Sequence, residues 1–564
     1  MIDHLLIRHY WKIYILLALI CYTGAIETPF LFDDILGIVE NPAIRSLWPI
    51  QNIMQVGEDE TPWGRPVVCL SLALNYAVGD LNVRGYHLFN LSIHILSACF
   101  LFKLLQRLLE DLFFIRSTTI YLAFVISSLW LVHPLGTNVV TYTVQRAEGF
   151  MILFYILTLY YSIAVLKNPS YRNYSYAIVF CALGMSSKES MFTAPIAVML
   201  LYSNVYGISF KRQFKEKRIL LMGLFSTWLI LALWMYLYPR NASVGTSLIS
   251  SSDYFMMQWK FIWKYISLSL WPLNLCIDYM APEVSIKEFW AYGLSLSVIL
   301  IVSLWSAFFK KWKIFYPILF LFLVLGPTSS FVPIQTSVAA EHRFVLPLAA
   351  LISFLVLSIY VVSKIKPNKN FNKIGFLLYF GTLVFLGFNT IERNKVYQST
   401  EKIWEDITQK QPKNARAWNN LGSHLILNGD SKKAIDHFDK ALSLNPNLAD
   451  AHSNIGLAFC NLKQFKKAIE SLKKSIELEP NHRNAFLNLG VTASRMGKFD
   501  LAIKAYNQAI HLSPYKPNAY VSLATLFRIQ GKRDKAMDLL KKALKIAPNY
   551  PYALKEQILL QRDL

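Results

Sequence analysis

The chain has 564 residues, of which 54% are hydrophobic and only 16% are charged. This length leaves room for several domains, and the positive mean hydropathy of +0.35 is typical of a polytopic membrane protein rather than a wholly soluble one. The formal net charge of +22 does not indicate nucleic-acid binding, because the basic residues fall in short clusters between apolar segments, where they set membrane orientation.

The membrane part begins with an apolar segment that follows Arg8, His9 and Lys12. No small-residue cleavage site comes after it, so we expect an uncleaved first membrane helix. Ten further segments are close to the roughly 20 apolar residues that a crossing helix needs. They lie near 86–104, 118–133, 148–166, 174–187, 191–207, 219–238, 290–309, 314–331, 343–363 and 373–390. The sequence therefore predicts about eleven spans.

Basic clusters fix the predicted orientation. With the N-terminus in the cytoplasm, the lysine- and arginine-rich stretches 103–116, 167–172, 211–218, 310–313 and 364–373 all fall on the cytoplasmic side. An odd number of spans then places everything after residue 390 outside. We predict a multi-pass protein of the plasma or inner membrane, or of the endoplasmic reticulum, with an extracytoplasmic C-terminal part.

Two adjacent carboxylates, Asp33 and Asp34, follow the first predicted helix where it emerges into water, and an Asn-Pro turn at 41–42 closes the segment. Neighbouring acids repel one another and are costly to desolvate, so the pair suits the handling of protons or cations. A solvated loop with a chance pair is the alternative. The pattern leaves open whether the pair acts as a base or holds a divalent cation. No other metal site is predicted, because the six cysteines show no paired spacing.

The predicted topology gathers further residues, ionisable except for one tryptophan, on the same face as this acidic pair. They come from four more outer loops as well as the first loop, and a phosphate-bearing lipid substrate could be held by such a set. Each residue taken singly could instead be a helix-end anchor. The set consists of Glu58, Asp59, Glu60, Trp63, Arg65, His133, Arg146, Glu148, Lys188, Glu189, Glu341, His342 and Arg343, with an amphipathic interfacial stretch at 257–265 in the fourth loop.

After residue 411 the pattern changes to soluble helices with a fixed period. Pro412, Pro446, Pro480, Pro514 and Pro548 recur at intervals of 34 residues, and Gly422, Gly456 and Gly490 follow the same step. This is the tetratricopeptide signature, in which pairs of helices stack into a solenoid. We therefore expect a membrane domain at 1–391, a helical linker at 392–411 and a repeat domain of four units plus a cap at 412–564.

One position of the first helix in successive repeats holds Asn420, Asn454 and Asn488. Carboxamides at this spacing could pair with the backbone of an extended acceptor polypeptide, and the arrangement resembles the asparagine ladder of O-GlcNAc transferase. The alternative is a polar residue that is merely tolerated on an exposed helix face.

Taken together, these residues resemble the transmembrane and tetratricopeptide-repeat-containing O-mannosyltransferases and their prokaryotic relatives in the GT-C superfamily. The motifs that carry the resemblance are Phe32-Asp-Asp34, Glu40-Asn-Pro42, Gly64-Arg-Pro66, His133-Pro134, Gln145-Arg146 with Glu148, Lys188-Glu189, Asp278-Tyr279 and 341–343. The resemblance implies an all-α, GT-C-like membrane domain followed by the repeat solenoid. It also implies that Asp33 or Asp34 is the general base and that Arg146, Lys188 and Arg343 hold a lipid phosphate.

The reaction implied by this family is inverting transfer of a mannose-like hexose from a polyprenyl or dolichyl phosphate to Ser or Thr hydroxyls of protein. The residue types fit it, since a carboxylate can activate the hydroxyl and cations can stabilise the departing phosphate. No glycine-rich phosphate loop appears. Two alternatives remain open: a lipid-linked oligosaccharide ligase or polymerase, and a non-enzymatic membrane scaffold whose repeats bind other proteins.

Overall fold

The computed structural model describes residues 2–48, 64–113, 115–239, 249–282, 284–308, 315–334, 337–365, 371–547 and 550–562. These residues form helices and connecting segments with no strand among them, which confirms the predicted all-α class. The chain divides into two compact units, Met1–Ser399 and Thr400–Leu564, and each is described by itself below.

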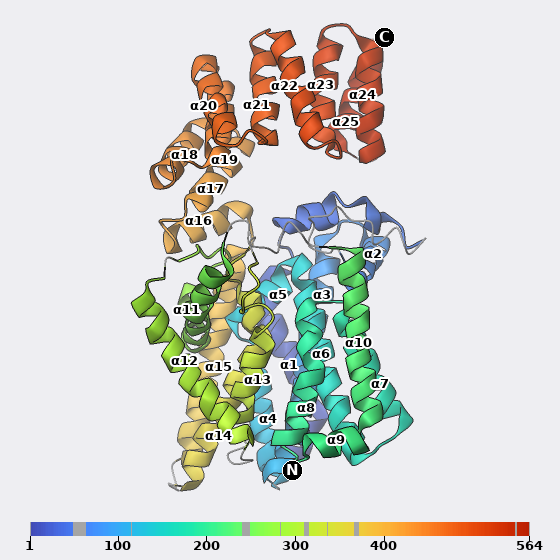
Figure 1. Ribbon diagram of the computed structural model, residues 1–564, viewed down its shortest axis with the longest axis vertical. Coiled ribbons are helices and arrows are strands. Elements are labelled where there is room, and N and C mark those ends of the chain that lie inside the picture. The colour runs from blue at the N-terminus through green and yellow to red at the C-terminus, as the bar shows by residue number, and fades with distance from the viewer. Residues whose placement is uncertain are drawn as a thin grey trace. The chain divides into compact units, whose positions relative to one another are not determined.

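The first unit is a bundle of long helices with short helices at its ends (Figure 1). Its helices are α1 (Ile2–Tyr22), α2 (Pro66–Gly79), α3 (Val83–Phe113), α4 (Arg116–Leu131), α5 (Thr137–Thr141), α6 (Arg146–Lys167), α7 (Tyr171–Met185), α8 (Ala194–Asn204), α9 (Phe210–Glu216), α10 (Arg218–Leu237), α11 (Ser251–Leu270), α12 (Ile286–Phe308), α13 (Tyr316–Leu325), α14 (Val345–Ile365) and α15 (Phe371–Val396).

Fewer helices are long and apolar enough to span a bilayer than the sequence suggested. Within the described residues, six helices are long and apolar enough to span a bilayer, or seven if the bent pair 116–131 and 134–141 counts as one span, against the predicted eleven or so. Every predicted span does coincide with a helix. However, α7, α8 and α13 have only 15, 11 and 10 residues, so even the longest reaches about 22 Å, short of the ~30 Å hydrocarbon core.

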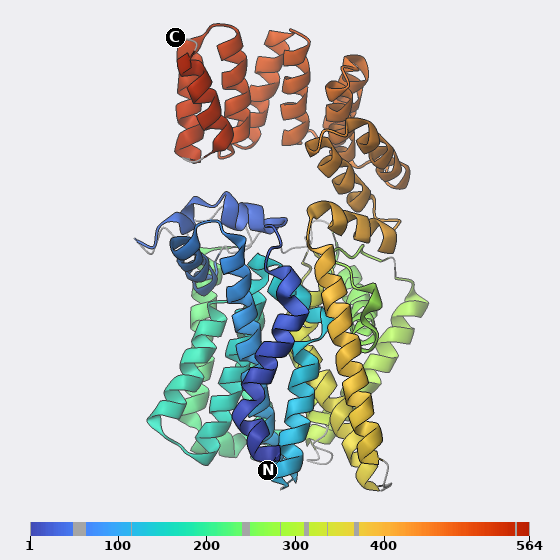
Figure 2. The same cartoon turned by 180° about the vertical axis from the view of Figure 1, so that it is seen from behind.

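The last long helix of this unit, α15, packs beside the first, α1 (Figure 2). Asn394 at the end of α15 donates from Nδ2 to the Cys21 carbonyl (3.0 Å) and accepts from the Thr141 hydroxyl (2.7 Å). Within the bundle, the Tyr14 hydroxyl of α1 is hydrogen-bonded to the Ser127 hydroxyl of α4. Buried polar groups need such partners, so these contacts fix α1 against α4 and α15.

α1 runs from the N-terminus to the opposite end of the bundle, where short helical segments follow it (Figure 2). A π-helix spans Ile35–Val39, and 3₁₀ segments span Pro42–Arg45, Pro134–Gly136, Thr143–Gln145, Glu189–Thr193 and Glu341–Phe344. The predicted outer residues 58–60 and 63, the basic residues 310–313 and Pro548 lie outside the described residues.

The second unit is a stack of antiparallel helix pairs that begins with α16 (Thr400–Lys410). The pairs are α17 (Ala415–Leu427) with α18 (Ser431–Leu444), α19 (Ala449–Asn461) with α20 (Phe465–Leu478), α21 (Arg483–Arg495) with α22 (Phe499–Leu512), and α23 (Pro517–Ile529) with α24 (Arg533–Ile546). The helix α25 (Pro551–Arg562) follows them. The predicted repeat solenoid is thereby confirmed.

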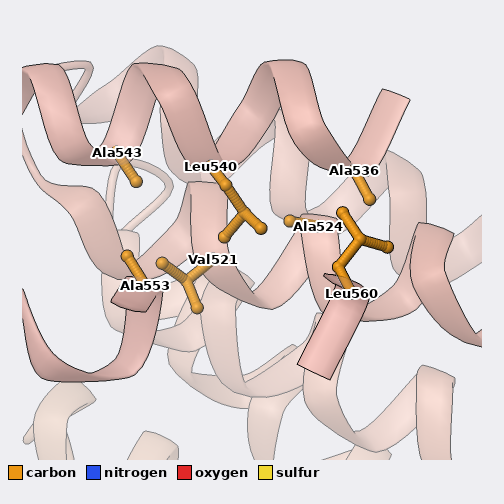
Figure 3. Packing of buried hydrophobic residues seen from close by; sticks show 7 residues of the cluster. All are labelled: Val521, Ala524, Ala536, Leu540, Ala543, Ala553 and Leu560. Carbon is orange, nitrogen blue, oxygen red and sulfur yellow. The ribbon is translucent and has the colours of Figure 1, made fainter. Parts of the chain in front are cut away.

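The period of the sequence has a packing cause. A Cβ added at Gly490 would lie only 2.5 Å from ring atoms of Tyr506, so only glycine lets the two helices of that pair approach this closely. At the end of the stack, Leu540 and Ala536 of α24 pack against Val521 of α23 and against Ala553 and Leu560 of α25 (Figure 3). The helix α25 thereby covers the apolar face of the α23–α24 pair.

Lys463 occupies a turn position that favours glycine. Its φ is +61°, while the residues one repeat before it and one and two repeats after it are Gly429, Gly497 and Gly531, with φ of +88°, +74° and +72°. A side chain in the left-handed region costs roughly 1 kcal/mol. We expect Lys463→Gly to raise the free energy of unfolding of residues 400–564 by about that amount in a denaturant titration. Lys473→Gly, in the middle of α20, is the matched control and should lower it by a similar amount. Equal effects of the two changes would contradict this account.

Candidate functional site

The acidic pair lies on a strained stretch of backbone. Phe32, directly before it, has φ of +46°, a conformation that an aromatic residue rarely adopts. Leu31 donates its N–H back to a carboxylate oxygen of Asp34 (3.1 Å), and the π-helix from Ile35 follows at once. Strain of this kind persists where surrounding contacts over-determine it, as at functional sites.

Asp34 points inward and is fully buried. Besides Leu31, its carboxylate accepts the backbone N–H groups of Val144 (2.8 Å) and Thr143 (3.4 Å), which precede α6. Burial raises the pKa of Asp34 to about 7, although these backbone hydrogen bonds oppose the shift. Asp34 thus ties the loop after α1 to the segment before α6 through backbone contacts.

Asp33, its neighbour, is exposed. Its backbone N–H donates to the Tyr142 hydroxyl (3.1 Å), and the same hydroxyl is hydrogen-bonded to the Asp33 carboxylate. The two acids therefore differ in access: solvent reaches the carboxylate of Asp33 and not that of Asp34. A general base must reach the proton that it removes, so geometry favours Asp33 in this role.

Arg146, a predicted phosphate ligand, is fully buried. It donates from Nε to the Asn90 side-chain oxygen (2.7 Å), from Nη2 to the Tyr86 carbonyl (3.2 Å) and from Nη1 to the Ser71 hydroxyl (3.3 Å). The guanidinium also lies 4.4 Å from the centre of the Phe89 ring and interacts electrostatically with Asp34. Its donors thus hold α2, α3 and α6 together beside the acidic pair.

The other cations form a cluster, and the ion pairs within it were not predicted from the sequence. Lys188 makes a buried ion pair with Glu148 of α6, and burial lowers the Lys188 pKa while Glu148 opposes the shift. Arg65 pairs with Glu189 at 3.1 Å. His342 lies within electrostatic range of Lys188, Arg65 and Arg343. Three loops between the helices thereby contribute to one charged region.

Arg343 and His133 are also engaged with the fold. Arg343 donates to the carbonyls of Ser337 (2.6 Å) and Val338 (3.3 Å). The His133 Nδ1 accepts the Leu135 N–H (3.1 Å), so its Nε2 carries the proton that goes to the Ser269 carbonyl (3.0 Å). His133 therefore links the loop after α4 to the end of α11, and it is buried, with 1% of its surface exposed.

Glu341 is the centre of a second buried network, and sequence reasoning missed its partner from α15. One oxygen of Glu341 accepts the Tyr279 hydroxyl (2.6 Å) and the Cys276 N–H, and the other lies 3.7 Å from Arg393. Arg393 follows the last predicted span within a polar run, Asn389 to Asn394, which is the signal that could have found it.

A divalent cation at the acidic pair has little support from the ligands present. Among the described residues, no cluster of three or more His, Cys, Asp or Glu side chains could hold a metal ion. Asp34 already accepts three backbone hydrogen bonds, which leaves Asp33 as the accessible carboxylate. The residues do not form a ready coordination shell, so no step below depends on a cation.

In the repeat unit, two of the three ladder asparagines, Asn454 and Asn488, contact the preceding repeat. Asn454 donates from Nδ2 to the Asn419 side-chain oxygen (3.0 Å) and the Ser423 hydroxyl (2.9 Å), and Asn488 donates to the Ser453 hydroxyl (3.0 Å). Asn420 accepts from Asn419 (3.2 Å). The carboxamides therefore help to join successive repeats, and Asn454 and Asn420 remain half-exposed.

An apolar cavity of about 430 Å³ lies in the first unit between α3, α6, α13 and α14. Along α14, its lining residues run from Leu346 to Val361, a length of about 22 Å. Leu346 is three residues from Arg343, so this cavity starts next to the cationic cluster. Its lining of leucines, Ala349, Ala350 and Phe320 suits a hydrocarbon chain.

These observations define an all-α protein with a membrane-type helical unit, an acidic and cationic site at one end of that unit, and a separate repeat unit. Tetratricopeptide repeat models match residues 415–448, 449–482 and 487–551. Over 77% of its length, the chain is similar to proteins named protein O-mannosyl-transferases.

Two relatives illustrate this similarity. "Protein O-mannosyl-transferase F38B6.6" of Caenorhabditis elegans is 26% identical over 77% of this chain and 62% of its own length. "Protein O-mannosyl-transferase TMTC3" of Homo sapiens is 23% identical over 77% of this chain and 51% of its own length. The chain thus spans between half and two thirds of the length of these relatives. Among solved structures, "Crystal structure of MamA" is 25% identical and covers 28% of this chain and 94% of its own, with a TM-score of 0.24.

Proposed function

We propose that this protein is a GT-C type membrane glycosyltransferase that moves a mannose-like hexose from a polyprenyl phosphate to Ser or Thr hydroxyls of protein. The observation that carries the proposal is an accessible carboxylate, Asp33, which contacts Tyr142 just before α6, while Glu148 in the first turn of α6 pairs with Lys188 of the cationic cluster. An apolar cavity begins at Leu346, three residues after Arg343 of that cluster. The names of the similar proteins support the same activity.

The reaction uses the side chains in distinct roles. The Asp33 carboxylate takes the proton of the acceptor hydroxyl while the hydroxyl oxygen attacks the anomeric carbon. The bond between that carbon and the phosphate oxygen breaks with inversion, and the lipid phosphate leaves with its electron pair. Lys188 and Arg65 stabilise the added negative charge through charge-assisted hydrogen bonds. Both belong to ion pairs, so the phosphate competes with Glu148 and Glu189 for them.

The apolar cavity is the proposed site of the isoprenoid chain. A phosphate at the cationic cluster would place the attached chain at Leu346, where the cavity begins. Burying apolar chain surface there contributes about 25 cal/mol per Å² toward donor binding. The donor is therefore recognised at both ends, by charge at the phosphate and by burial along the lipid.

The repeat unit is proposed to bind the acceptor polypeptide on the extracytoplasmic side of the membrane, where the acidic pair also lies. Tethering an acceptor site to the catalytic unit raises the local acceptor concentration. Because the Nδ2 atoms of Asn454 and Asn488 are used between repeats, an acceptor N–H would be expected to meet their Oδ1 atoms.

The direct test is transfer from labelled donors. Purified full-length protein, given labelled dolichyl phosphate mannose and a Ser/Thr-rich peptide, should form labelled peptide. Alkaline β-elimination should then release the labelled mannose from that peptide. A panel of other polyprenyl-phosphate hexoses identifies the preferred sugar. Transfer from none of them, together with normal function after Asp33, Lys188 and Arg65 are each replaced by Ala, would favour the scaffold alternative.

Filling the apolar cavity should affect the lipid and not the chemistry. Ala350 lines the cavity, and Ala350→Phe would occupy part of its volume. We expect KM for a long-chain donor to rise about tenfold, equivalent to ~1.4 kcal/mol of lost binding, with kcat little changed. KM for a donor with a single short isoprenoid should stay the same. Val78→Phe is the control, because Val78 is exposed and lies outside the cavity. An equal rise for both donors would contradict the lipid assignment.

A further inference from the structure

A second cavity, also about 430 Å³, lies between α3, α6 and α7 and takes no part in the proposed reaction. Three cationic and three aromatic side chains line it: Arg107, Lys167, Arg172, Tyr160, Tyr161 and Tyr176. It differs from the first cavity in chemistry, because charged and phenolic groups replace the leucines.

This polar cavity is remote from the acidic pair. The candidate active site uses Tyr86 and Asn90 near the start of α3 and Arg146 at the start of α6. The polar cavity uses Arg107 near the end of α3 and Lys167, the last residue of α6. The length of α6 between Arg146 and Lys167 corresponds to about 30 Å. The two sites therefore lie at opposite ends of the same helices.

The charges of the cavity are only partly compensated. Lys167 pairs with Asp111 at 2.6 Å, and Asp111 also accepts the Tyr206 hydroxyl (2.8 Å). The Arg107 guanidinium lies 4.2 Å from the centre of the Tyr160 ring, and its buried Nη1 has no hydrogen-bond partner in the described part of the chain. Arg172, which is exposed, interacts electrostatically with Tyr161, as does Arg107. Two positive charges therefore remain without an acidic partner in the cavity.

The depth of Arg107 indicates what compensates it. Arg107 lies in the candidate span Val83–Leu112, five residues before its end, or about 8 Å along the helix. A guanidinium at that depth is costly without an anion, and the phosphate of a lipid head group lies at the boundary where α6 ends. The surrounding tyrosines are the side chains that gather at this level of a bilayer.

We propose that this polar cavity binds the phosphate of an anionic phospholipid from the leaflet that faces the basic loops. Arg107 and Arg172 hold the phosphate, Arg107 being oriented by its stacking on Tyr160, and the tyrosine hydroxyls can donate to the head group. The binding site is independent of glycosyl transfer, and it would exist even if the protein were a scaffold.

Native mass spectrometry of the full-length protein tests this site. The probes are phosphatidylglycerol and phosphatidylcholine with identical acyl chains, together with inorganic phosphate. We expect the protein to retain one phosphatidylglycerol at least about tenfold more tightly than phosphatidylcholine, since a hydrogen bond to a charged group contributes roughly 1.5 to 3 kcal/mol. Inorganic phosphate at the same concentration should not displace it.

Two pairs of variants distinguish binding in this cavity from attraction of the lipid by the overall positive charge of the protein. Arg107→Gln with Arg172→Gln should remove the preference for phosphatidylglycerol, and Arg172→Gln alone should weaken it, which is informative even if the double variant does not fold. Lys211→Gln with Arg218→Gln, two exposed cations outside the cavity, removes the same charge and should leave the preference intact. Equal losses in both pairs, no lipid preference in the unmodified protein, or displacement by inorganic phosphate would each overturn the proposal.

Discussion

Replacing Asp33 by Asn is expected to lower the rate of glycosyl transfer by about two to four orders of magnitude, the usual contribution of a general base. The change removes the proton acceptor but keeps the shape of the side chain and the backbone N–H that donates to Tyr142. Because Asp33 is exposed, the fold should be unaffected. Single-turnover transfer assays at saturating donor measure the loss, and the thermal unfolding temperature verifies the fold.

Asp34→Asn is the matched variant, and its effect should be of another kind. An Asn amide group would face one or more of the backbone N–H groups that the Asp34 carboxylate now accepts from Leu31, Thr143 and Val144. Leaving a buried donor unsatisfied costs about 1 to 3 kcal/mol, so Asp34→Asn should lower the unfolding temperature. Its activity should fall because the loop that carries Asp33 is no longer held in place. Full activity in both single variants would rule out either acid as the base, and full activity in Asp33→Asn alone would transfer the role to Asp34.

Lys188→Met is expected to be the most destabilising single change in the charged cluster. It leaves Glu148 buried without its cation, at 2% side-chain exposure, and breaking a buried pair from one side costs about 3 to 5 kcal/mol. The measurement is the unfolding temperature of the purified protein. Arg212→Met, which breaks an exposed pair with Glu216 in α9, is the matched control and should cost only about 0.3 to 0.5 kcal/mol.

A double change distinguishes the structural role of Lys188 from its proposed contact with phosphate. Lys188→Met with Glu148→Gln removes both buried charges and should restore most of the lost stability. If Lys188 also stabilises the departing phosphate, this refolded double variant should still transfer sugar at least about a hundredfold more slowly. Normal transfer by a stable double variant would show that Lys188 acts only through the fold.

Elements with strong local patterns could be predicted from the sequence. The helix at every predicted span follows from long apolar runs, and the repeat unit follows from a 34-residue period of Pro, Gly and Ala. The number of helices long enough to span a bilayer was predicted less accurately than these elements. Hydropathy records that α8 and α13 are apolar, but their lengths depend on where Pro195, Pro317 and the neighbouring turns let each helix begin and end.

The candidate site was predictable as a set of residues but not as an arrangement. Loop residues such as Arg65, Lys188 and Arg343 could be collected on one face because charge sidedness is a property of the sequence. Their partners could not, since Glu148 is 40 positions from Lys188 and Glu189 is 124 positions from Arg65. Tyr142, which contacts Asp33, carries no local pattern that marks it.

The sequence by itself determined the class of the protein, its division into an apolar part and a repeat part, and the chemistry available in the loops between its apolar helices, because these depend on composition and period. Only the tertiary structure decided which of two adjacent aspartates meets solvent and whether each cation is committed to the fold. The direction in which a side chain points from an irregular loop depends on distant backbone groups. For Asp34 these are the N–H groups of Thr143 and Val144, together with the positive φ of Phe32. No local preference of the chain encodes such contacts, since they form only when separate loops pack together.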